Sequence, residues 1–108
     1  MEIKDIILAP IPQRDGEVKF RPLLVLKKMP TFDDFLVCGI STQLHQEISG
    51  FDEILVANNQ NRLRSDSLIR LSFLAIISAS QMSGRLGYIE ADMHQLLLKR
   101  LSNYLIST

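Results

Sequence analysis

Residues 19–26 read Lys-Phe-Arg-Pro-Leu-Leu-Val-Leu, and this stretch decides the fold class. From Leu23 onward the run is continuously apolar, which is typical of a β-strand that is buried on both faces. Pro22 has no N–H group to donate to a sheet ladder, so we expect it at the first residue of that strand. Arg21 then opens a buried strand, where its guanidinium needs solvent, an acidic partner or a phosphate.

Other short segments with the composition of strands lie on both sides of this run. Apolar and β-branched residues gather over residues 3–9, 35–40, 53–57, 67–77 and 85–89. We expect the first of these strands to end at Pro10 and Pro12, because neither residue can donate to a ladder. Asp15-Gly16 is a turn signal between the first two strands. The sequence therefore predicts several short strands rather than regular βαβ units.

The C-terminal segment has helical periodicity instead. Apolar residues recur at every fourth position, and two more widen the stripe: Met93, Leu97, Leu101 and Leu105, with Leu96 and Tyr104. His94 falls one residue off this stripe, so we expect it at the surface. Short strands with one terminal amphipathic helix predict a mainly β (α+β) fold, a strongly bent sheet or barrel with the helix packed on it. The length fits a single domain, 1–108.

Composition excludes several classes of protein. Lys+Arg and Asp+Glu number 12 each, so a uniformly basic nucleic-acid binder is excluded, although a local basic patch is not. The single cysteine excludes a disulfide framework, and no apolar run is long enough for a signal peptide or a membrane span. We therefore expect a soluble cytoplasmic protein that does not bind a membrane. No spacing typical of a metal site or a cofactor loop is present, so none is expected.

Several polar or reactive residues have simple structural interpretations. We expect Cys38 to be a small buried hydrophobe inside a strand. The pairs Asp33-Asp34 and Asp52-Glu53 are expected as solvated loop charges. Phe20, Phe32 and Phe51 favour core or dimer packing, with stacking on unpaired bases as the alternative.

One arrangement of residues could bind a phosphate. Arg21 begins a buried strand, Ser41-Thr42-Gln43 ends another, and Arg70 lies inside a third. The planar guanidinium matches phosphate oxygens in pairs, and a hydroxyl at a strand end could complete the site. The simpler interpretation is that both arginines are structural and are tied to carboxylates or carbonyls. Spacing alone favours that simpler interpretation.

Four segments resemble a known family when taken in order. They are residues 19–26, Val-Cys-Gly-Ile-Ser-Thr-Gln at 37–43, Ser-Asp-Ser-Leu-Ile-Arg-Leu at 65–71 and Gly-Arg-Leu-Gly-Tyr-Ile at 84–89. Together they are similar to the MazF/PemK toxins of bacterial type II toxin–antitoxin systems. The resemblance implies an SH3-like β-barrel with a C-terminal α-helix, usually assembled as a homodimer. It also implies an endoribonuclease that cleaves single-stranded RNA, often mRNA, without a metal or cofactor, and that a cognate antitoxin inhibits.

The resemblance also assigns roles to residues. The family's catalytic arginine and hydroxyl residue correspond to Arg21 and Ser41, and the residues expected to bind RNA are Lys19, Thr42, Gln43, His45 and Arg70. In the implied reaction the ribose 2′-hydroxyl attacks the adjacent phosphate and leaves a 2′,3′-cyclic phosphate. Arginine is a poor base, so His45 is the candidate for proton transfer near neutral pH, with a solvated loop histidine as the simpler interpretation.

Two departures keep an alternative function open. The PemK-like branch of the family has a carboxylate where this chain has Ser72, and another arginine of the family is Ala75 here. The alternative is a catalytically degenerate SH3-like barrel that binds a protein or a nucleic acid.

Overall fold

The Asp15-Gly16 turn closes a long antiparallel hairpin at the start of the chain. The structure, a computed structural model, describes residues 2–108. β1 (Asp5–Pro12) pairs with β2 (Val18–Lys28) along almost its whole length. Gly16 has a φ of +88°, a conformation that glycine adopts at little cost. The turn expected from the sequence is thereby confirmed.

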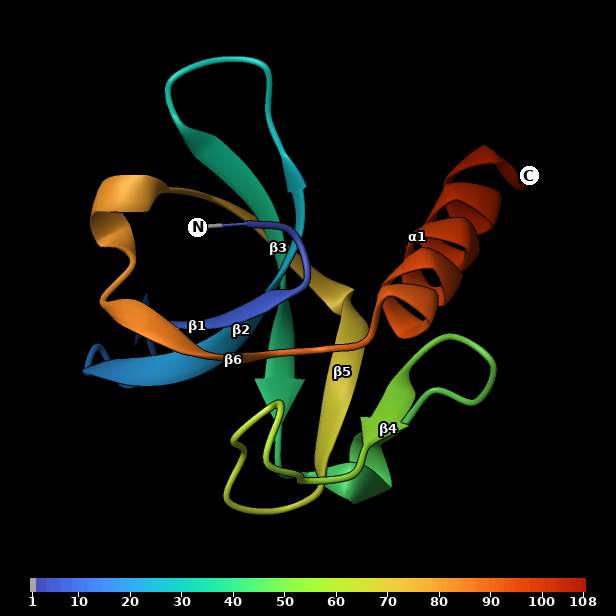
Figure 1. The fold of residues 1–108 in the computed structure, drawn as a ribbon, viewed down its shortest axis with the longest axis horizontal. Coiled ribbons are helices and arrows are strands. Elements are labelled where there is room, and N and C mark those ends of the chain that lie inside the picture. The colour runs from blue at the N-terminus through green and yellow to red at the C-terminus, as the bar shows by residue number, and fades with distance from the viewer. Residues whose placement is uncertain (1) are drawn as a thin grey trace.

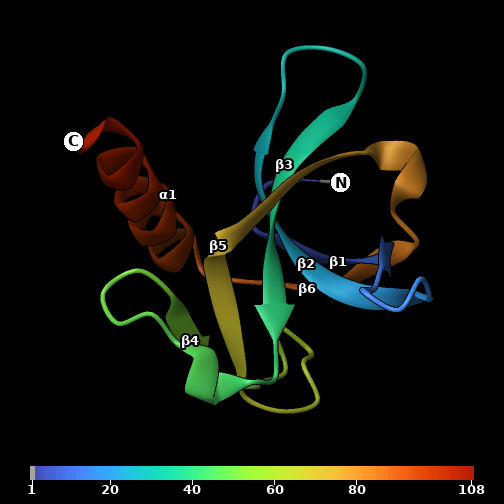
Figure 2. The same cartoon turned by 180° about the vertical axis from the view of Figure 1, so that it is seen from behind.

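Residues 2–108 form one six-stranded antiparallel sheet with the order β4-β5-β3-β2-β1-β6. The sheet curls strongly on itself, and one α-helix lies beside it (Figures 1 and 2). The expected mainly β fold with a closing helix is confirmed. The remaining elements are β3 (Asp34–Ser41), η1 (Leu44–Gln46), β4 (Glu53–Leu55), β5 (Ser67–Ser78), η2 (Ala79–Gln81), β6 (Gly84–Tyr88) and α1 (Ala91–Ile106).

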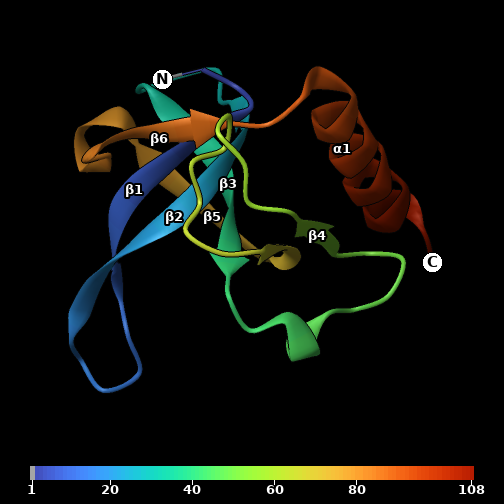
Figure 3. The ribbon, with the colours of Figure 1, turned by 60° about the horizontal axis from the view of Figure 1, so that its bottom comes forward.

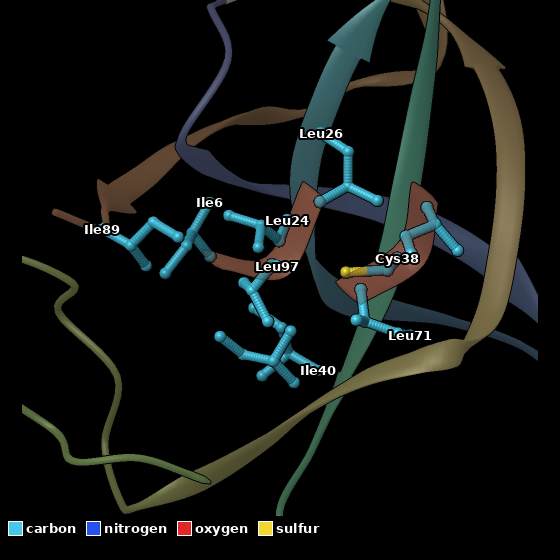
Figure 4. Close-up of a cluster of buried hydrophobic side chains, with 10 residues drawn as sticks. Ile6, Leu24, Leu26, Cys38, Ile40, Leu71, Ile89 and Leu97 are labelled. Atoms are coloured by element: carbon cyan, nitrogen blue, oxygen red, sulfur yellow. The ribbon is translucent and has the colours of Figure 1, made fainter. Parts of the chain in front are cut away.

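The central strands are buried on both faces, as the apolar run predicts. Leu24 and Leu26 face a cluster that α1 covers through Leu97, whereas Leu23 and Val25 face a second cluster on the opposite side. Figure 4 shows the first cluster, with Cys38 inside it. Cys38 is fully buried, so its predicted role as a small hydrophobe is confirmed.

The prolines do not end the strands where we expected. β1 continues through Pro10 and Pro12, because only its first half, Asp5–Leu8, also pairs with β6. The Leu8 carbonyl accepts a hydrogen bond from the N–H of Ser83, on the β6 side of β1. Because backbone groups alternate along a strand, the N–H and C=O groups at positions 8, 10 and 12 all point away from β2. The missing N–H groups of both prolines therefore point to an open edge, where they cost no ladder bond.

His94 is buried rather than at the surface. Its Nε2–H donates to the carbonyl oxygen of Leu26 at 2.9 Å, which ties α1 to β2. The buried face of α1 is therefore formed by His94, Leu97 and Leu101, while Leu105 at the end of the predicted stripe is 68 % exposed.

Asp52 is also buried, contrary to the prediction of a solvated loop charge. The β3–β5 pairing steps from Cys38 opposite Leu74 to Gly39 opposite Arg70, so residues 71–73 of β5 form a bulge. In the bulge the N–H of Leu71 donates to the Asp52 carboxylate instead of to a strand. The buried carboxylate thus satisfies a donor that the irregular sheet leaves free.

None of the helices within residues 2–108 has the length and apolar character needed to cross a bilayer.

Candidate functional site

A cavity opens where β2 and β3 separate. The β2–β3 ladder begins at Leu23 opposite Gly39, so the part of β2 before Leu23 pairs only with β1. Pro22 lies at this point and has no N–H with which to extend the ladder. β3 continues beyond Gly39 to Ser41 in contact with β5. Figure 3 shows the β1–β2 hairpin diverging from β3 and β5, and the cavity between them encloses about 340 Å³.

Residues distant in the sequence meet in this cavity. The lining includes Arg21 from β2, Ser41-Thr42-Gln43 from the end of β3, and Arg70 from β5. The structure therefore brings together five of the seven residues singled out in the sequence. Lys19 and His45 are exposed and do not line the cavity.

Arg21 is an exposed cation held by a neutral partner. Its Nη2–H donates to Oε1 of Gln13 at 3.2 Å. Within residues 2–108 neither Arg21 nor Arg70 forms an ion pair with a carboxylate. Arg21 is thus tied to an amide carbonyl oxygen rather than to an acid, as one form of the simpler interpretation expects, whereas Arg70 has no acidic partner among these residues.

Ser41 lines the cavity, and its hydroxyl oxygen has one hydrogen-bond donor. Its Oγ accepts a hydrogen bond from the N–H of Gln43 at 3.1 Å, which fixes the tight turn after β3. A serine hydroxyl is both donor and acceptor, so its O–H can still donate. Thr42 and Gln43 are exposed at the rim of the cavity.

Arg70 forms the positive floor of the cavity. Its Nε is buried and has no hydrogen-bond partner among the described residues. A buried N–H without a partner costs about 1–3 kcal/mol, which the packing around Arg70 must offset. Opposite Arg70 lies Gly39, where an added Cβ would lie only 3.0 Å from the ring of Phe73. Glycine thus gives Phe73 the room to stand beside Arg70 in the lining.

The chemistry of the lining is that of an anion site. The lining side chains are neutral or cationic, and none of them is a carboxylate, imidazole or thiol. Two guanidinium groups and a hydroxyl donor suit phosphate oxygens. Cys38 takes no part, because burial, and next the charge of Asp52, raise the pKa of its thiol well above the ordinary range.

Gln13 and Phe73 are two of the lining residues that were not singled out from the sequence. Gln13 lies in a polar hairpin loop, and nothing in its local pattern distinguishes it from its neighbours. Phe73 reads as an ordinary strand residue, and only the bulge turns it toward Arg70. Phe20 and Phe32 are 63 % and 86 % exposed, so they lie outside the core, and dimer packing or base stacking stays the prediction for them, whereas Phe51 packs on Tyr104.

Comparison with known proteins agrees with the fold and with the family resemblance. The fold is similar to that of the Mycobacterium tuberculosis toxin MazF-mt6, with a TM-score of 0.67 and 23 % sequence identity over 94 % of this chain and 95 % of that one. No match was found among curated protein sequences. Residues 2–105 match the family described as PemK-like, MazF-like toxin of type II toxin–antitoxin system. The chain therefore belongs to the PemK-like, MazF-like toxins of type II toxin–antitoxin systems.

Proposed function

We propose that this toxin is an endoribonuclease that cleaves single-stranded RNA, including mRNA, in the cytoplasm without a metal ion. The observation that carries the proposal is the meeting of Arg21, Ser41 and Arg70 around one cavity. Arg21 and Ser41 are the proposed catalytic residues. Arg70, Thr42 and Gln43 are the proposed RNA-binding residues of the same cavity.

The proposed reaction is an internal phosphoryl transfer. The ribose 2′-oxygen forms a bond to phosphorus and gives its proton to solvent, while the bond to the 5′-oxygen breaks and that oxygen takes up a proton. The products are a 2′,3′-cyclic phosphate and a free 5′-hydroxyl. Negative charge grows on the phosphate oxygens in the transition state, where fixed positive charge stabilises it most. Arg21 and Arg70 supply that charge, and the Ser41 hydroxyl donates to a phosphate oxygen.

The RNA strand also needs contacts outside the phosphate. Lys19 and Arg21 are two residues apart on β2 and therefore project from the same side of the strand. Lys19 is exposed and would neutralise the next phosphate along the chain. Phe73 is 40 % exposed in the cavity and would stack on an unpaired base. His45, which is exposed outside the cavity, would at most contact the RNA farther along.

The proposed assembly is a homodimer with an antitoxin as its inhibitor. Exposed apolar side chains on β5, Leu74 and Ile76, provide surface that a second copy would bury. An antitoxin segment with acidic and apolar side chains would bind the arginines and the apolar lining residues of the cavity, where it would exclude RNA.

The test is RNA cleavage in excess EDTA. Labelled single-stranded RNA of varied sequence is incubated with the protein and with Arg21→Ala and Ser41→Ala. Lys99→Ala removes one exposed positive charge from α1, which contributes no residue to the cavity, and serves as the matched control. We expect cleavage by the unmodified protein and by the control, with products that end in a cyclic phosphate. Arg21→Ala should lose at least about a hundredfold in kcat/KM.

One observation supports a second candidate function. The cavity lining contains no side chain that titrates near neutral pH, so the chain supplies no general base there. The protein would then be a barrel that binds RNA or an acidic protein segment without cleaving it. RNA that is bound in an Arg21-dependent manner, but stays intact across all the sequences tried, would establish this function and overturn the ribonuclease proposal.

A further inference from the structure

Gln13 is the most completely fixed polar residue at the cavity. Its backbone N–H donates to the Glu17 carbonyl at 2.6 Å, and its own carbonyl accepts from the N–H of Gly16 at 3.0 Å. Its side-chain Nε2 donates to the carbonyl of Ile11 at 2.9 Å. The backbone of Gln13 is thus held by the hairpin turn and its side chain by the end of β1.

Oε1 is the one polar atom of Gln13 that these contacts do not use, and they orient it toward Arg21. Oε1 accepts from Nη2 of Arg21 at 3.2 Å. The amide cannot be turned over, because the reversed amide would face the Ile11 carbonyl with an oxygen and the guanidinium with an NH₂ group. The hairpin turn therefore dictates the position of one edge of the guanidinium.

The partner of Arg21 is neutral, and this affects its charge as well as its position. A carboxylate in place of the amide would pair with the guanidinium and compete with a phosphate for it. The amide uses one N–H group of Arg21 and leaves the remaining donors and the full positive charge for a ligand. An arginine on a strand that is otherwise exposed loses less side-chain entropy on binding when it is held in advance.

We propose that Gln13 is a positioning residue that holds Arg21 toward the bound phosphate and keeps its charge unpaired. The proposal rests on the ribonuclease function proposed above. Gln13 itself contacts neither the attacking nor the leaving oxygen; it acts through Arg21. Misplacement of a catalytic group by about 1 Å costs up to about a hundredfold in rate, which sets the size of the expected effect.

Two variants separate position from charge. Gln13→Met keeps the length of the side chain and removes the acceptor, and we expect kcat to fall about tenfold or more with KM less affected. Gln13→Glu introduces a carboxylate, so we expect weaker RNA binding and lower activity at neutral pH. Relative to the unmodified protein at the same pH, that activity should recover as the pH falls and the introduced carboxyl becomes neutral. Gln95→Glu makes the same change on an exposed face of α1 and should behave as the unmodified protein.

The pH recovery is a readout that a merely structural role would not produce. If Gln13→Met and Gln13→Glu retain the unmodified kcat, KM and pH profile, the proposal is wrong. It is also wrong if both variants lose activity only in proportion to the fraction that is unfolded, as measured by circular dichroism.

A measurement without RNA separates this proposal from the ribonuclease proposal. The ¹⁵N–¹H signal of the Arg21 guanidinium, assigned with Arg21→Lys, should report a restricted side chain in the unmodified protein and a mobile one in Gln13→Met. Restriction that depends on Gln13 in a protein that cleaves no RNA would support the positioning and overturn the ribonuclease function. Equal mobility in both proteins would overturn the positioning even if RNA is cleaved.

Discussion

The buried carboxylate of Asp52 accepts a hydrogen bond from the backbone N–H of Leu71 at 3.0 Å, in the bulge that places Arg70 and Phe73 in the cavity. Its second oxygen accepts from the N–H of Ile48 at 3.1 Å. One side chain thus joins the loop after η1 to the irregular part of β5. The geometry of the cavity floor therefore depends on a residue that does not line it.

Replacement of Asp52 should destabilise the fold. Asp52→Asn keeps the shape but turns one acceptor into a donor that faces a backbone N–H. We expect a loss of about 1–3 kcal/mol in the free energy of unfolding, measured by urea titration. Asp66→Asn is the control, because Asp66 uses a single oxygen to accept from Ala57 at an exposed site. A loss at Asp52 no larger than at Asp66 would contradict the role assigned to the buried carboxylate.

Stability should fall at acid pH because of His94. Burial lowers the pKa of this imidazole below its ordinary value of 6.5, the carbonyls of Leu26 and Val25 oppose that shift, and Lys4 and Lys27 add to it. The unfolded chain therefore takes up a proton as the pH falls through 6.5, while the folded chain still resists it. The contribution of His94 to stability is complete above that pH and decreases as the pH falls toward the lowered pKa.

Urea titrations between about pH 5 and pH 8 would measure this effect. One group can contribute a slope of at most about 1.4 kcal/mol per pH unit. His94→Gln should remove this part of the pH dependence, and His45→Gln, at an exposed position, should retain it. An unchanged slope in His94→Gln would show that other groups cause the acid sensitivity.

The rate of RNA cleavage should show no histidine titration. None of the lining side chains has an ordinary pKa near neutrality, so we expect kcat to rise steadily with hydroxide concentration rather than to follow a bell-shaped curve. His45→Gln should keep that profile. A bell-shaped profile that His45→Gln abolishes would make His45 the base and would require RNA binding to bring it into the cavity.

Two glycine substitutions should differ according to what surrounds them. A Cβ at Gly87 would collide with the backbone carbonyls of Gln60 and Asn61. The loop that holds Gln60 and Asn61 cannot move away easily. The buried Asn61 side chain forms hydrogen bonds with the backbone of Val56, Asn58 and Leu63. We expect Gly87→Ala to cost about 2–3 kcal/mol in unfolding free energy.

In Gly39→Ala the added methyl group would contact a side chain rather than the backbone. The added methyl group would press on the ring of Phe73, which can rotate, so we expect a loss of only about 1 kcal/mol. Displacement of the Phe73 ring should reduce the free energy of RNA binding by more than it reduces the free energy of unfolding. Equal losses of stability in the two variants, by urea titration, would contradict this distinction between backbone and side-chain neighbours.

Much of the fold follows from local sequence alone. Continuous apolar runs such as Leu23–Leu26 specify strands that are buried on both faces. Asp15-Gly16 specifies the hairpin turn, and apolar residues at every fourth position from Met93 specify the helix. The burial of Cys38 follows in the same way from its apolar neighbours. These features depend on residues close together in the chain, so their pattern is visible before folding.

The tertiary structure decided what happens to polar groups. His94 and Asp52 are buried because Leu26 and Leu71, which lie 68 and 19 residues away in the chain, provide the partners that make burial tolerable. Pro10 and Pro12 fit a strand because no neighbour requires their N–H groups. Arg21, Ser41 and Arg70 share a cavity because β2 and β3 separate at Pro22. A buried polar side chain needs a hydrogen-bond partner, and here that partner is distant in the sequence. The two groups meet only when the sheet assembles, so the local sequence does not reveal the contact.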